Sequence, residues 1–322
     1  MREKITVIIP TCKRKKLLIR CLEALVLQNI PKEDFRVIVV SDGPDLQTQA
    51  ALESWRIDRF LNLDFVQTPL KGGPAAARNY GWKRSDTPLI AFTDDDCIPD
   101  RGWLSAFLRH SSGQEGMAFT GKTVVPLPEK KTDFAINMAQ LEQADFITAN
   151  CACTRAALNK VHGFDERFKM AWREDSDLEF NLITHQISII QVPEAIVLHP
   201  VRDVPWGISI KEQKKGLYDA LLFKKFPSLY RKKISSAIWN YYGIILSVIL
   251  LATGFIFNRY YLFLFALCGM VFLFAAFIAR RLNQRHKSLN HVIEIVSTSL
   301  LIPFISVFWR IYGAIKYRVF FL

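Results

Sequence analysis

The first hundred residues alternate short apolar runs with an amphipathic segment. The runs at residues 5–9 and 36–40 are rich in Val and Ile and are bounded by turn residues, which is typical of buried strands. Between them, residues 17–27 place apolar side chains at helical spacing. Strand, helix and strand in this order predict a parallel βαβ unit.

Later segments continue this alternation. A third apolar run at residues 60–66 precedes a glycine-bearing loop at 71–74, a helix begins near Ala75, and a buried strand follows at 89–93. The order predicts an open α/β sheet whose ligands lie at the carboxyl ends of the strands. Beyond it the pattern is irregular, with a helix around residues 134–144, and we expect this half to complete the same site.

Two uncharged apolar segments near the C-terminus are each long enough to span a bilayer. They cover residues 237–257 and 260–279, and only Asn258 and Arg259 separate them. Such a short connection predicts a tight helical hairpin.

A third apolar segment, residues 291–309, has a mixed character. It contains His291, Glu294 and Pro303 and leads into a basic aromatic tail at 310–322. A full span would place this tail outside the cell, against the positive-inside rule. An interfacial or re-entrant helix is therefore favoured over a third spanning helix, which stays an alternative.

The formal charge of +12 is concentrated in this apolar part of the chain. Up to Tyr230 there are 31 Lys and Arg against 29 Asp and Glu, whereas from Arg231 on there are 11 against 1. Basic flanks around apolar runs favour membrane lipid over nucleic acid as a partner. Both flanks of the hairpin are basic, which predicts that they lie in the cytosol.

These patterns predict a domain at 1–210, a basic juxtamembrane segment at 211–233 and a membrane region at 234–322. The segment 211–231 mixes basic and apolar residues as an amphipathic surface segment does, although a packed helix with a solvated basic face has the same pattern. The N-terminal apolar run is too short for a signal peptide, so we expect a cytosolic first domain at the inner or plasma membrane. The six cysteines lack metal or redox spacing and fit small buried hydrophobic residues.

Three consecutive acids, Asp94, Asp95 and Asp96, follow the buried run at 89–93. Neighbouring carboxylates raise one another's pKa unless a cation neutralises them. Their oxygen atoms suit Mg²⁺ or Mn²⁺, so a divalent metal is the expected cofactor. A solvated acidic turn is the alternative.

A series of motifs carries a resemblance to a known family. The motifs are Val7-Ile8-Ile9-Pro10-Thr11 with Arg14, Val39-Val40-Ser41-Asp42-Gly43, Gly73-Pro74-Ala75-Ala76-Ala77-Arg78-Asn79, Thr93-Asp94-Asp95-Asp96, Asn150, Gly163-Phe164-Asp165-Glu166 and Glu174-Asp175-Ser176-Asp177-Leu178. In this order, over roughly residues 4–200, they resemble family 2 glycosyltransferases with the GT-A fold. The resemblance implies an α/β fold, a mixed Rossmann-like sheet with helices on both faces, followed here by a helical membrane region.

The resemblance also implies a nucleotide-sugar donor and assigns residues to it. The donor-binding residues would be Pro10, Thr11, Arg14, Asp42, Arg78 and Asp94. Asp42 would contact the base, and Asp96 would ligate the metal that bridges the diphosphate. His199 resembles the histidine that completes the metal shell in some relatives, although a lone histidine is often structural. The resemblance gives Asp95 no role.

On the acceptor side, Asp175 matches the general base of the family. It would remove a proton from the acceptor hydroxyl, whose oxygen attacks the anomeric carbon with inversion. Its neighbours Glu174 and Asp177 would raise its proton affinity, and with Asn150 they form the acceptor side. Acids are also common in the first turn of a helix, which is the alternative for Asp175 and Asp177.

Departures from the family pattern bear on the acceptor. Asn181 and Gln186 stand where many relatives have an arginine and a glycine, and no Gln-x-x-Arg-Trp follows His199. We therefore expect an inverting transfer of a single sugar to a membrane-associated acceptor, such as a lipid-linked glycan or polysaccharide precursor. The alternatives are transfer to polyprenyl phosphate, a non-catalytic membrane scaffold that keeps the nucleotide-sugar site, and, more remotely, a nucleotidyltransferase.

Overall fold

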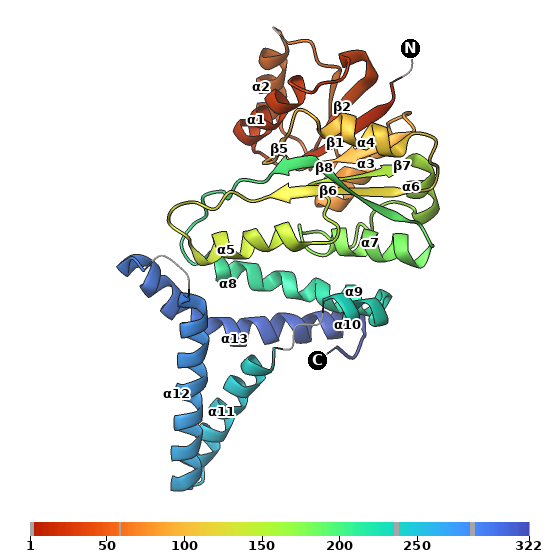
Figure 1. Cartoon of the computed structure of the whole chain (residues 1–322). Helices are drawn as coiled ribbons and strands as arrows, with labels where there is room; N and C mark the ends of the chain where they lie inside the picture. The colour runs from red at the N-terminus through yellow and green to blue at the C-terminus, as the bar shows by residue number, and fades with distance from the viewer. Residues whose placement is uncertain (1–2, 58, 235–237, 284–286, 322) are drawn as a thin grey trace. The chain divides into compact units, whose positions relative to one another are not determined.

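The computed structural model describes residues 3–57, 59–234, 238–283 and 287–321, and it divides into two compact units. The sheet unit comprises Met1–Pro126 and Ala139–Val201, and the helical unit comprises Leu127–Met138 and Arg202–Leu322 (Figure 1). The chain therefore enters the helical unit twice. The divisions expected at 210 and 233 stay predictions, and the parts of the expected membrane region at 235–237 and 284–286 lie outside the described residues.

The sheet unit is built on one mixed sheet of eight strands in the order β3-β2-β1-β4-β7-β6-β8-β5. The strands are β1 (Ile5–Thr11), β2 (Phe35–Ser41), β3 (Leu63–Gln67), β4 (Leu89–Phe92), β5 (Ile98–Pro99), β6 (Ala118–Val124), β7 (Cys151–Thr154) and β8 (Ile189–Leu198). The first four are parallel, as the βαβ pattern predicted. β7 runs antiparallel to both β4 and β6, which makes the sheet mixed and confirms the predicted fold class.

The third strand begins later than the apolar run at 60–66 predicted. β3 pairs with β2 only from Leu63, which lies opposite Val37. Phe60 is 90% exposed, so its apolar side chain does not belong to a buried strand. An apolar residue next to a strand cannot be told from a strand residue by periodicity alone.

Helices cover both faces of the sheet. They are α1 (Lys15–Val26), η1 (Lys32–Asp34), α2 (Leu46–Arg56), α3 (Pro74–Trp82), α4 (Trp103–Ser111), η2 (Gln140–Gln143), α6 (Arg155–Val161) and α7 (Glu174–Thr184). Alternate residues of β1 enter different cores, because Val7 packs with α1, α2 and α4 while Ile8 packs with α3, α6 and α7. Burial on both faces explains why these strands are continuous apolar runs.

The helical unit begins with a short helix and then collects the C-terminal helices. It contains α8 (Ile208–Glu212), η3 (Gln213–Gly216), α9 (Leu217–Lys225), α10 (Pro227–Lys233), α11 (Trp239–Ile256), α12 (Tyr260–Leu282) and α13 (Leu289–Tyr317), together with most of α5 (Asp133–Ala139). The helix expected around 134–144 is thus α5 followed by the 3-10 turn η2. The helices α11, α12 and α13 are each long and apolar enough to cross a membrane.

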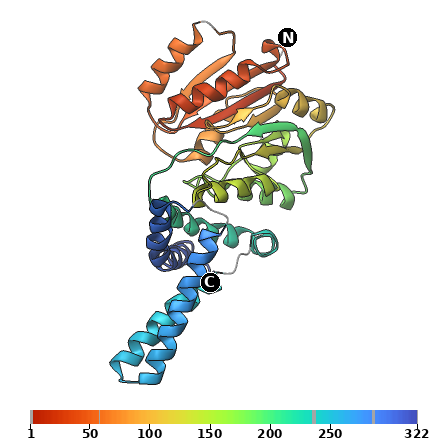
Figure 2. The same cartoon turned by 60° about the vertical axis from the view of Figure 1, so that its left-hand side comes forward.

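The predicted hairpin is formed by α11 and α12, which pack side by side (Figure 2). Close approach near the turn depends on Gly254, because a Cβ atom there would lie 2.7 Å from the backbone nitrogen of Phe263. α13 is one continuous helix of 29 residues with Pro303 inside it.

Candidate functional site

Three parallel strands end at the same edge of the sheet and carry the N-terminal motifs there. Thr11 ends β1, Asp42 follows β2, and the acidic motif Thr93–Asp96 follows β4. The backbone amide of Asp42 donates to Thr11 O at 2.9 Å, and that of Thr93 donates to Ile8 O at 3.3 Å. Residues more than 80 positions apart in the sequence therefore meet at one sheet edge.

Asp95 joins the acidic motif to the loop after β1. Its carboxylate accepts hydrogen bonds from Thr11 Oγ1 at 2.7 Å and from Arg14 NH1 at 3.2 Å. Burial raises the pKa of Asp95 to about 6, and the positive charge of Arg14 opposes that rise. Asp95, to which the family resemblance gave no role, thus positions Thr11 and Arg14, two of the predicted donor-binding residues.

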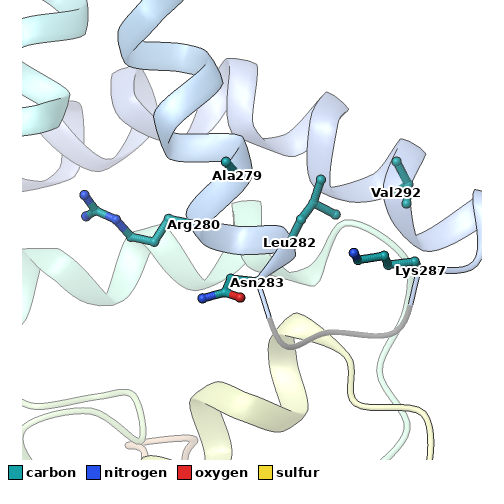
Figure 3. Close-up of a pocket in the computed structure, with 6 residues that line it drawn as sticks. All are labelled: Ala279, Arg280, Leu282, Asn283, Lys287 and Val292. Atoms are coloured by element: carbon teal, nitrogen blue, oxygen red, sulfur yellow. The ribbon is translucent and has the colours of Figure 1, made fainter.

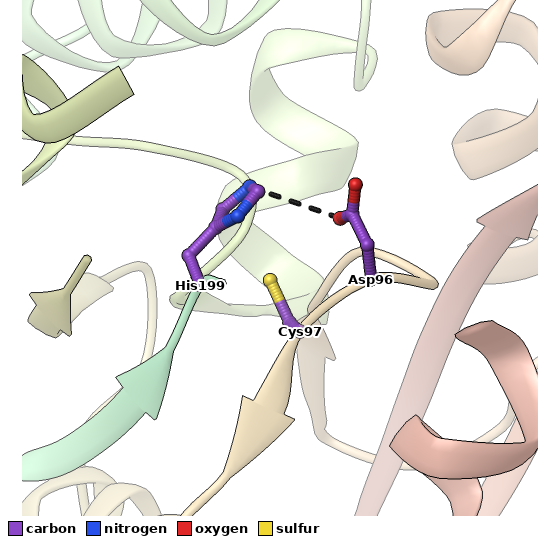
Figure 4. A group of neighbouring side chains, drawn as sticks. All are labelled: Asp96, Cys97 and His199. Atoms are coloured by element: carbon purple, nitrogen blue, oxygen red, sulfur yellow. Dashed lines mark ion pairs between the residues drawn. The ribbon is translucent and has the colours of Figure 1, made fainter. Parts of the chain in front are cut away.

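Asp96, Cys97 and His199 form a buried group whose potential ligand atoms lie within 4.8 Å of one another (Figure 4). His199 follows β8, where its backbone amide donates to Val124 O at 2.8 Å. The distance from His199 Nε2 to Asp96 Oδ1 is 3.7 Å. This is long for a hydrogen bond, but two ligands of one ion at about 2.1 Å each are separated by roughly 3–4 Å.

The chemistry of this group fits a hard divalent cation. A carboxylate oxygen and an imidazole nitrogen are ligands that Mn²⁺ accepts. Burial raises the pKa of Cys97 well above its usual value, and the neighbouring acids raise it further, so the thiol stays neutral. Arg14 NH1 lies 3.7 Å from Asp96 Oδ2 and supplies a positive charge at the same place. The metal-binding roles of Asp96 and His199 stay predictions.

Asp42 shapes the glycine loop before α3. Its Oδ1 atom accepts hydrogen bonds from the amides of Gly72 at 2.7 Å and Gly73 at 2.9 Å. Gly73 has a φ of 92°, and a Cβ atom there would lie 2.5 Å from Lys169 O, so only glycine fits. Pro10 is half-buried near the end of β1, opposite Val40. The base contact of Asp42 is a prediction that this geometry does not test.

Arg78 links the two acidic clusters of the sequence. It lies in the second turn of α3 and is 2% exposed. Its NH2 atom is 2.6 Å from Asp94 Oδ1, and its NH1 atom is 3.2 Å from Glu174 Oε1. Burial works against the charge, but the two carboxylates raise the pKa of Arg78 above its usual value. One guanidinium therefore connects the strand-end motif with the N-terminus of α7.

The second acidic cluster occupies the first turn of α7. Burial raises the pKa of Glu174 to about 7, and repulsion from Asp175 adds to the rise. Burial also raises the pKa of Asp175, although the Ser176 amide, which donates to Asp175 Oδ1 at 2.6 Å, and Arg173 oppose it. Asp177 is fully buried. A carboxylate with raised proton affinity suits a general base, and first-turn acids remain the alternative explanation.

Asn150 lies inside the fold. It is 0% exposed, accepts a hydrogen bond from Trp103 Nε1 at 2.8 Å and donates to Lys122 O and Ala195 O, each at 2.9 Å. These contacts tie α4, β6 and β8 together beneath the site. An acceptor contact by Asn150 stays a prediction.

The sequence of the sheet unit matches a known family. The profile of glycosyl transferase family 2 covers residues 6–168, about half of the chain. The chain belongs to glycosyl transferase family 2. It has a GT-A-like sheet and three apolar C-terminal helices.

Relatives of this family 2 glycosyltransferase include a pre-mycofactocin glycosyltransferase of Mycobacterium tuberculosis. The two are 30% identical over 218 residues, which cover 62% of this chain and 43% of that protein. The chain thus matches less than half the length of this relative.

Among solved structures, the mannosyltransferase PcManGT of Pyrobaculum calidifontis, in complex with GDP-Man and Mn²⁺, has a TM-score of 0.55 and 19% identity. The alignment covers 99% of this chain and 88% of that one. Residues 1–349 of TarS from Staphylococcus aureus, in complex with UDP-GlcNAc, have a TM-score of 0.51 and 16% identity over 99% and 93% of the two chains. At these identities the likeness describes the fold.

Proposed function

We propose that this glycosyltransferase transfers a single sugar, with inversion, from a nucleotide-diphosphate sugar to a membrane-associated acceptor. The observation that carries the proposal is the position of Arg78, 2.6 Å from Asp94 and 3.2 Å from Glu174. It holds the predicted donor motif and the predicted base, Asp175, in one site. Nucleotide-sugar complexes of PcManGT and TarS, which share the fold, support a donor of this class.

Asp96 and His199 are the residues that would hold a divalent cation. When bound, such an ion neutralises the charge of the diphosphate and of the leaving group. The side chain of Arg14 is 41% exposed beside Asp95 and Asp96, where its guanidinium can add positive charge toward the same phosphates. Thr11 and Arg14 are fixed in place by their hydrogen bonds to Asp95.

Asp175 is proposed to act on the acceptor. It takes the proton of the acceptor hydroxyl while that oxygen bonds to the anomeric carbon, and the bond from this carbon to the diphosphate breaks on the opposite face. The raised pKa of Asp175 helps it to accept the proton. Arg78, bound to Glu174, holds the start of α7 and thereby positions Asp175.

The membrane-associated acceptor is inferred from the apolar helices α11, α12 and α13. An acceptor with a lipid tail would share the bilayer with the enzyme. We place the catalytic unit on the cytosolic side because both flanks of the hairpin are basic.

A panel of nucleotide-sugars tests this function. The purified chain in detergent is given each donor with Mn²⁺, with Mg²⁺ or with chelator, and release of the nucleotide is measured with and without a lipid-linked acceptor. We expect one donor class to be consumed in a metal-dependent manner, faster with the acceptor. Consumption that needs only a bare polyprenyl phosphate would favour the alternative acceptor, and consumption of no donor would contradict the proposal.

A further inference from the structure

An apolar stripe runs along one side of α13. Its members expose between 38% and 72% of their surface and are Ile293, Leu300, Leu301, Phe304, Phe308, Ile311 and Ile315. From Leu301 on they recur at intervals of three and four residues, and Ile293 lies two helical turns before Leu300. This spacing places them on one face of the helix. The stripe contains no charged residue over roughly 33 Å of helix length. Ser297 interrupts the stripe between Ile293 and Leu301, but an uncharged and largely apolar face of this size still favours an apolar partner.

The opposite side of α13 buries polar groups. Thr298 and Ser299 are 0% exposed, and each hydroxyl accepts a hydrogen bond from Arg281 NH1 at 2.8 Å. The NH2 atom of Arg281 in turn lies 2.8 Å from Asp133 Oδ2. Apolar residues such as Ile295 and Ile302 are buried on this side as well. A helix on the surface of a water-soluble protein also turns apolar residues inward, but its outward side is polar, whereas the outward side of α13 is apolar. The outer face of α13 is therefore suited to lipid.

A row of short helices accompanies α13 along most of its length. The amide of Gly207, just before α8, donates to Glu294 Oε1 at 2.6 Å. Further along, Lys214 lies over the ring of Trp309, and Lys224 Nζ donates to Tyr317 O at 2.7 Å. In these three contacts the residue numbers increase in both segments, from 207 to 224 and from 294 to 317, so the row from α8 to α9 runs parallel to α13.

This row is highly charged. It carries Lys211, Glu212, Lys214, Lys215, Asp219, Lys224 and Lys225 within residues 208–225. If α13 crossed the bilayer, the row packed along it would have to enter the hydrocarbon as well. Charged side chains at that depth are costly, and seven in one segment make this arrangement unfavourable. By contrast, α11 contains no charged residue, and those of α12 lie only in its last turn.

The position of Arg281 gives a second, independent argument. It lies in the last turn of α12 and contacts Ser299, ten residues after the start of α13. If α12, a candidate span by its length and composition, crosses the bilayer, its last turn marks the bilayer surface. Ser299 lies at the same level, although it would be roughly 15 Å deep in a helix that entered the bilayer at Leu289. Figure 1 shows α13 running across the ends of α11 and α12.

We propose that α13 lies in the membrane interface, with its apolar stripe on the hydrocarbon and the charged row on the aqueous side. Two of the three candidate helices, α11 and α12, then cross the bilayer. The C-terminal residues stay on the same side as the start of α11. The partner of the stripe is the lipid bilayer.

Basic residues lie at the level that this arrangement assigns to lipid head groups. A pocket of about 560 Å³ at the end of α12 is lined by Ala279, Arg280, Leu282, Asn283, Lys287 and Val292 (Figure 3). Arg280 and Lys287 supply positive charge, while Leu282 and Val292 supply apolar surface. This combination suits the phosphate and upper acyl chain of an anionic lipid.

Cysteine labelling tests the topology in intact cells. Arg259→Cys lies in the hairpin turn, Phe320→Cys replaces a side chain after α13 that is 87% exposed, and Glu53→Cys on α2 reports the side of the sheet unit. With a membrane-impermeant maleimide, we expect Arg259→Cys to react in intact cells. Phe320→Cys and Glu53→Cys should react only after permeabilisation. Labelling of the native chain, measured in parallel, gives the background signal from its own cysteines. Labelling of Phe320→Cys in intact cells, or of Arg259→Cys only after permeabilisation, would overturn the proposal.

Depth measurements test the interfacial position without any enzymatic activity. Fluorophores are attached to Ile293→Cys, Leu301→Cys and Ile311→Cys in a Cys12→Ser, Cys268→Ser background, and quenching by shallow and deep spin-labelled lipids is compared. We expect one shallow depth for all three positions. Phe272→Cys, exposed in the middle of α12, is the matched deep control. A Leu301 label as deep as the Phe272 label, with shallow labels on either side, would show a third span.

Discussion

The two acidic clusters of the sheet unit lie on different kinds of backbone and have different surroundings. Asp94, Asp95 and Asp96 follow a parallel strand, where Arg14 and His199 face them. Asp175 and its neighbours begin a helix, where burial raises the pKa of Glu174 and Asp175 as it raises that of Asp95 in the first cluster, but no histidine lies beside them among the contacts described. The first cluster resembles a cation site and the second a proton acceptor. Both clusters consist of carboxylates, and we propose different roles for them, cation binding and proton acceptance, because their surroundings differ.

Asp96→Asn should have the largest effect on the first cluster. The change keeps the size of the side chain but removes a charge that the proposed metal requires. We expect transfer to fall on the order of 10³-fold, with donor binding no longer promoted by Mn²⁺. The control is Asp64→Asn on β3, which loses a surface pair with Arg36 on β2 and should keep transfer within about twofold. A tenfold loss or less in Asp96→Asn would remove this residue from the metal site.

Arg78→Gln should break the connection between the clusters. It leaves Asp94 and Glu174 without their shared cation, so we expect the free energy of unfolding to fall by about 3–5 kcal/mol. Thermal unfolding in detergent measures the change. Arg36→Gln, at an exposed pair, should cost about 0–1 kcal/mol.

A double variant tests whether the lost stability comes from the unpaired carboxylates. Adding Glu174→Gln to Arg78→Gln removes one of the stranded carboxylates and should restore part of the lost stability. If Arg78→Gln unfolds at the same temperature as Arg36→Gln, the buried pairs do not hold the clusters together.

His199→Gln should weaken the first cluster without abolishing it. We expect the apparent affinity for Mn²⁺, measured by titrating transfer activity, to fall roughly 10–100-fold and activity to return at high Mn²⁺. His110→Gln on α4 is the control, because its ring bonds only the local Ala106 O among the contacts described. An unchanged Mn²⁺ requirement together with lower thermal stability would make His199 structural.

Arg173→Gln should have the smallest effect and acts on the second cluster. The base must be deprotonated to act, and burial raises the pKa of Asp175. In the pH profile of kcat/KM, the midpoint of the acid limb, the fall at acid pH, should therefore lie above about 4, the ordinary pKa of Asp. The charge of Arg173 lowers this pKa, and its removal should shift the limb further toward neutral pH. Activity at pH 6 relative to pH 8 should fall a few-fold.

The surface residue Arg167 provides the control for this shift. Its guanidinium pairs with Asp165, and Arg167→Gln should leave the acid limb in place. A limb that moves to lower pH in Arg173→Gln would exclude Asp175 as the titrating base.

Much of the sheet unit could be predicted because its signals are local. Continuous Val and Ile runs identified β1, β2 and β4, and parallel strands bring their carboxyl ends to one edge. The motifs at these ends were therefore expected to meet. The start of β3 was predicted three residues early, because the sequence shows that Phe60 is apolar but not that its side chain is exposed to solvent.

Contacts between distant side chains could not be predicted in the same way. The role of Asp95 depends on Thr11 and Arg14, more than 80 residues away, and the bridge from Arg78 to Glu174 joins α3 to α7. The placement of α13 likewise depends on which face packs against α9. Such information lies in the tertiary structure rather than in any spacing of residues.

We propose that the first cluster binds the donor with its metal while Asp175 carries out proton transfer. The most direct test measures both quantities in Asp175→Asn: binding of the nucleotide-sugar with Mn²⁺ by calorimetry, and transfer to the acceptor. We expect donor binding within a few-fold of the native chain and a loss of transfer of about 10²–10⁴-fold. Retained transfer, or loss of donor binding together with transfer, would contradict the division of roles between the two clusters.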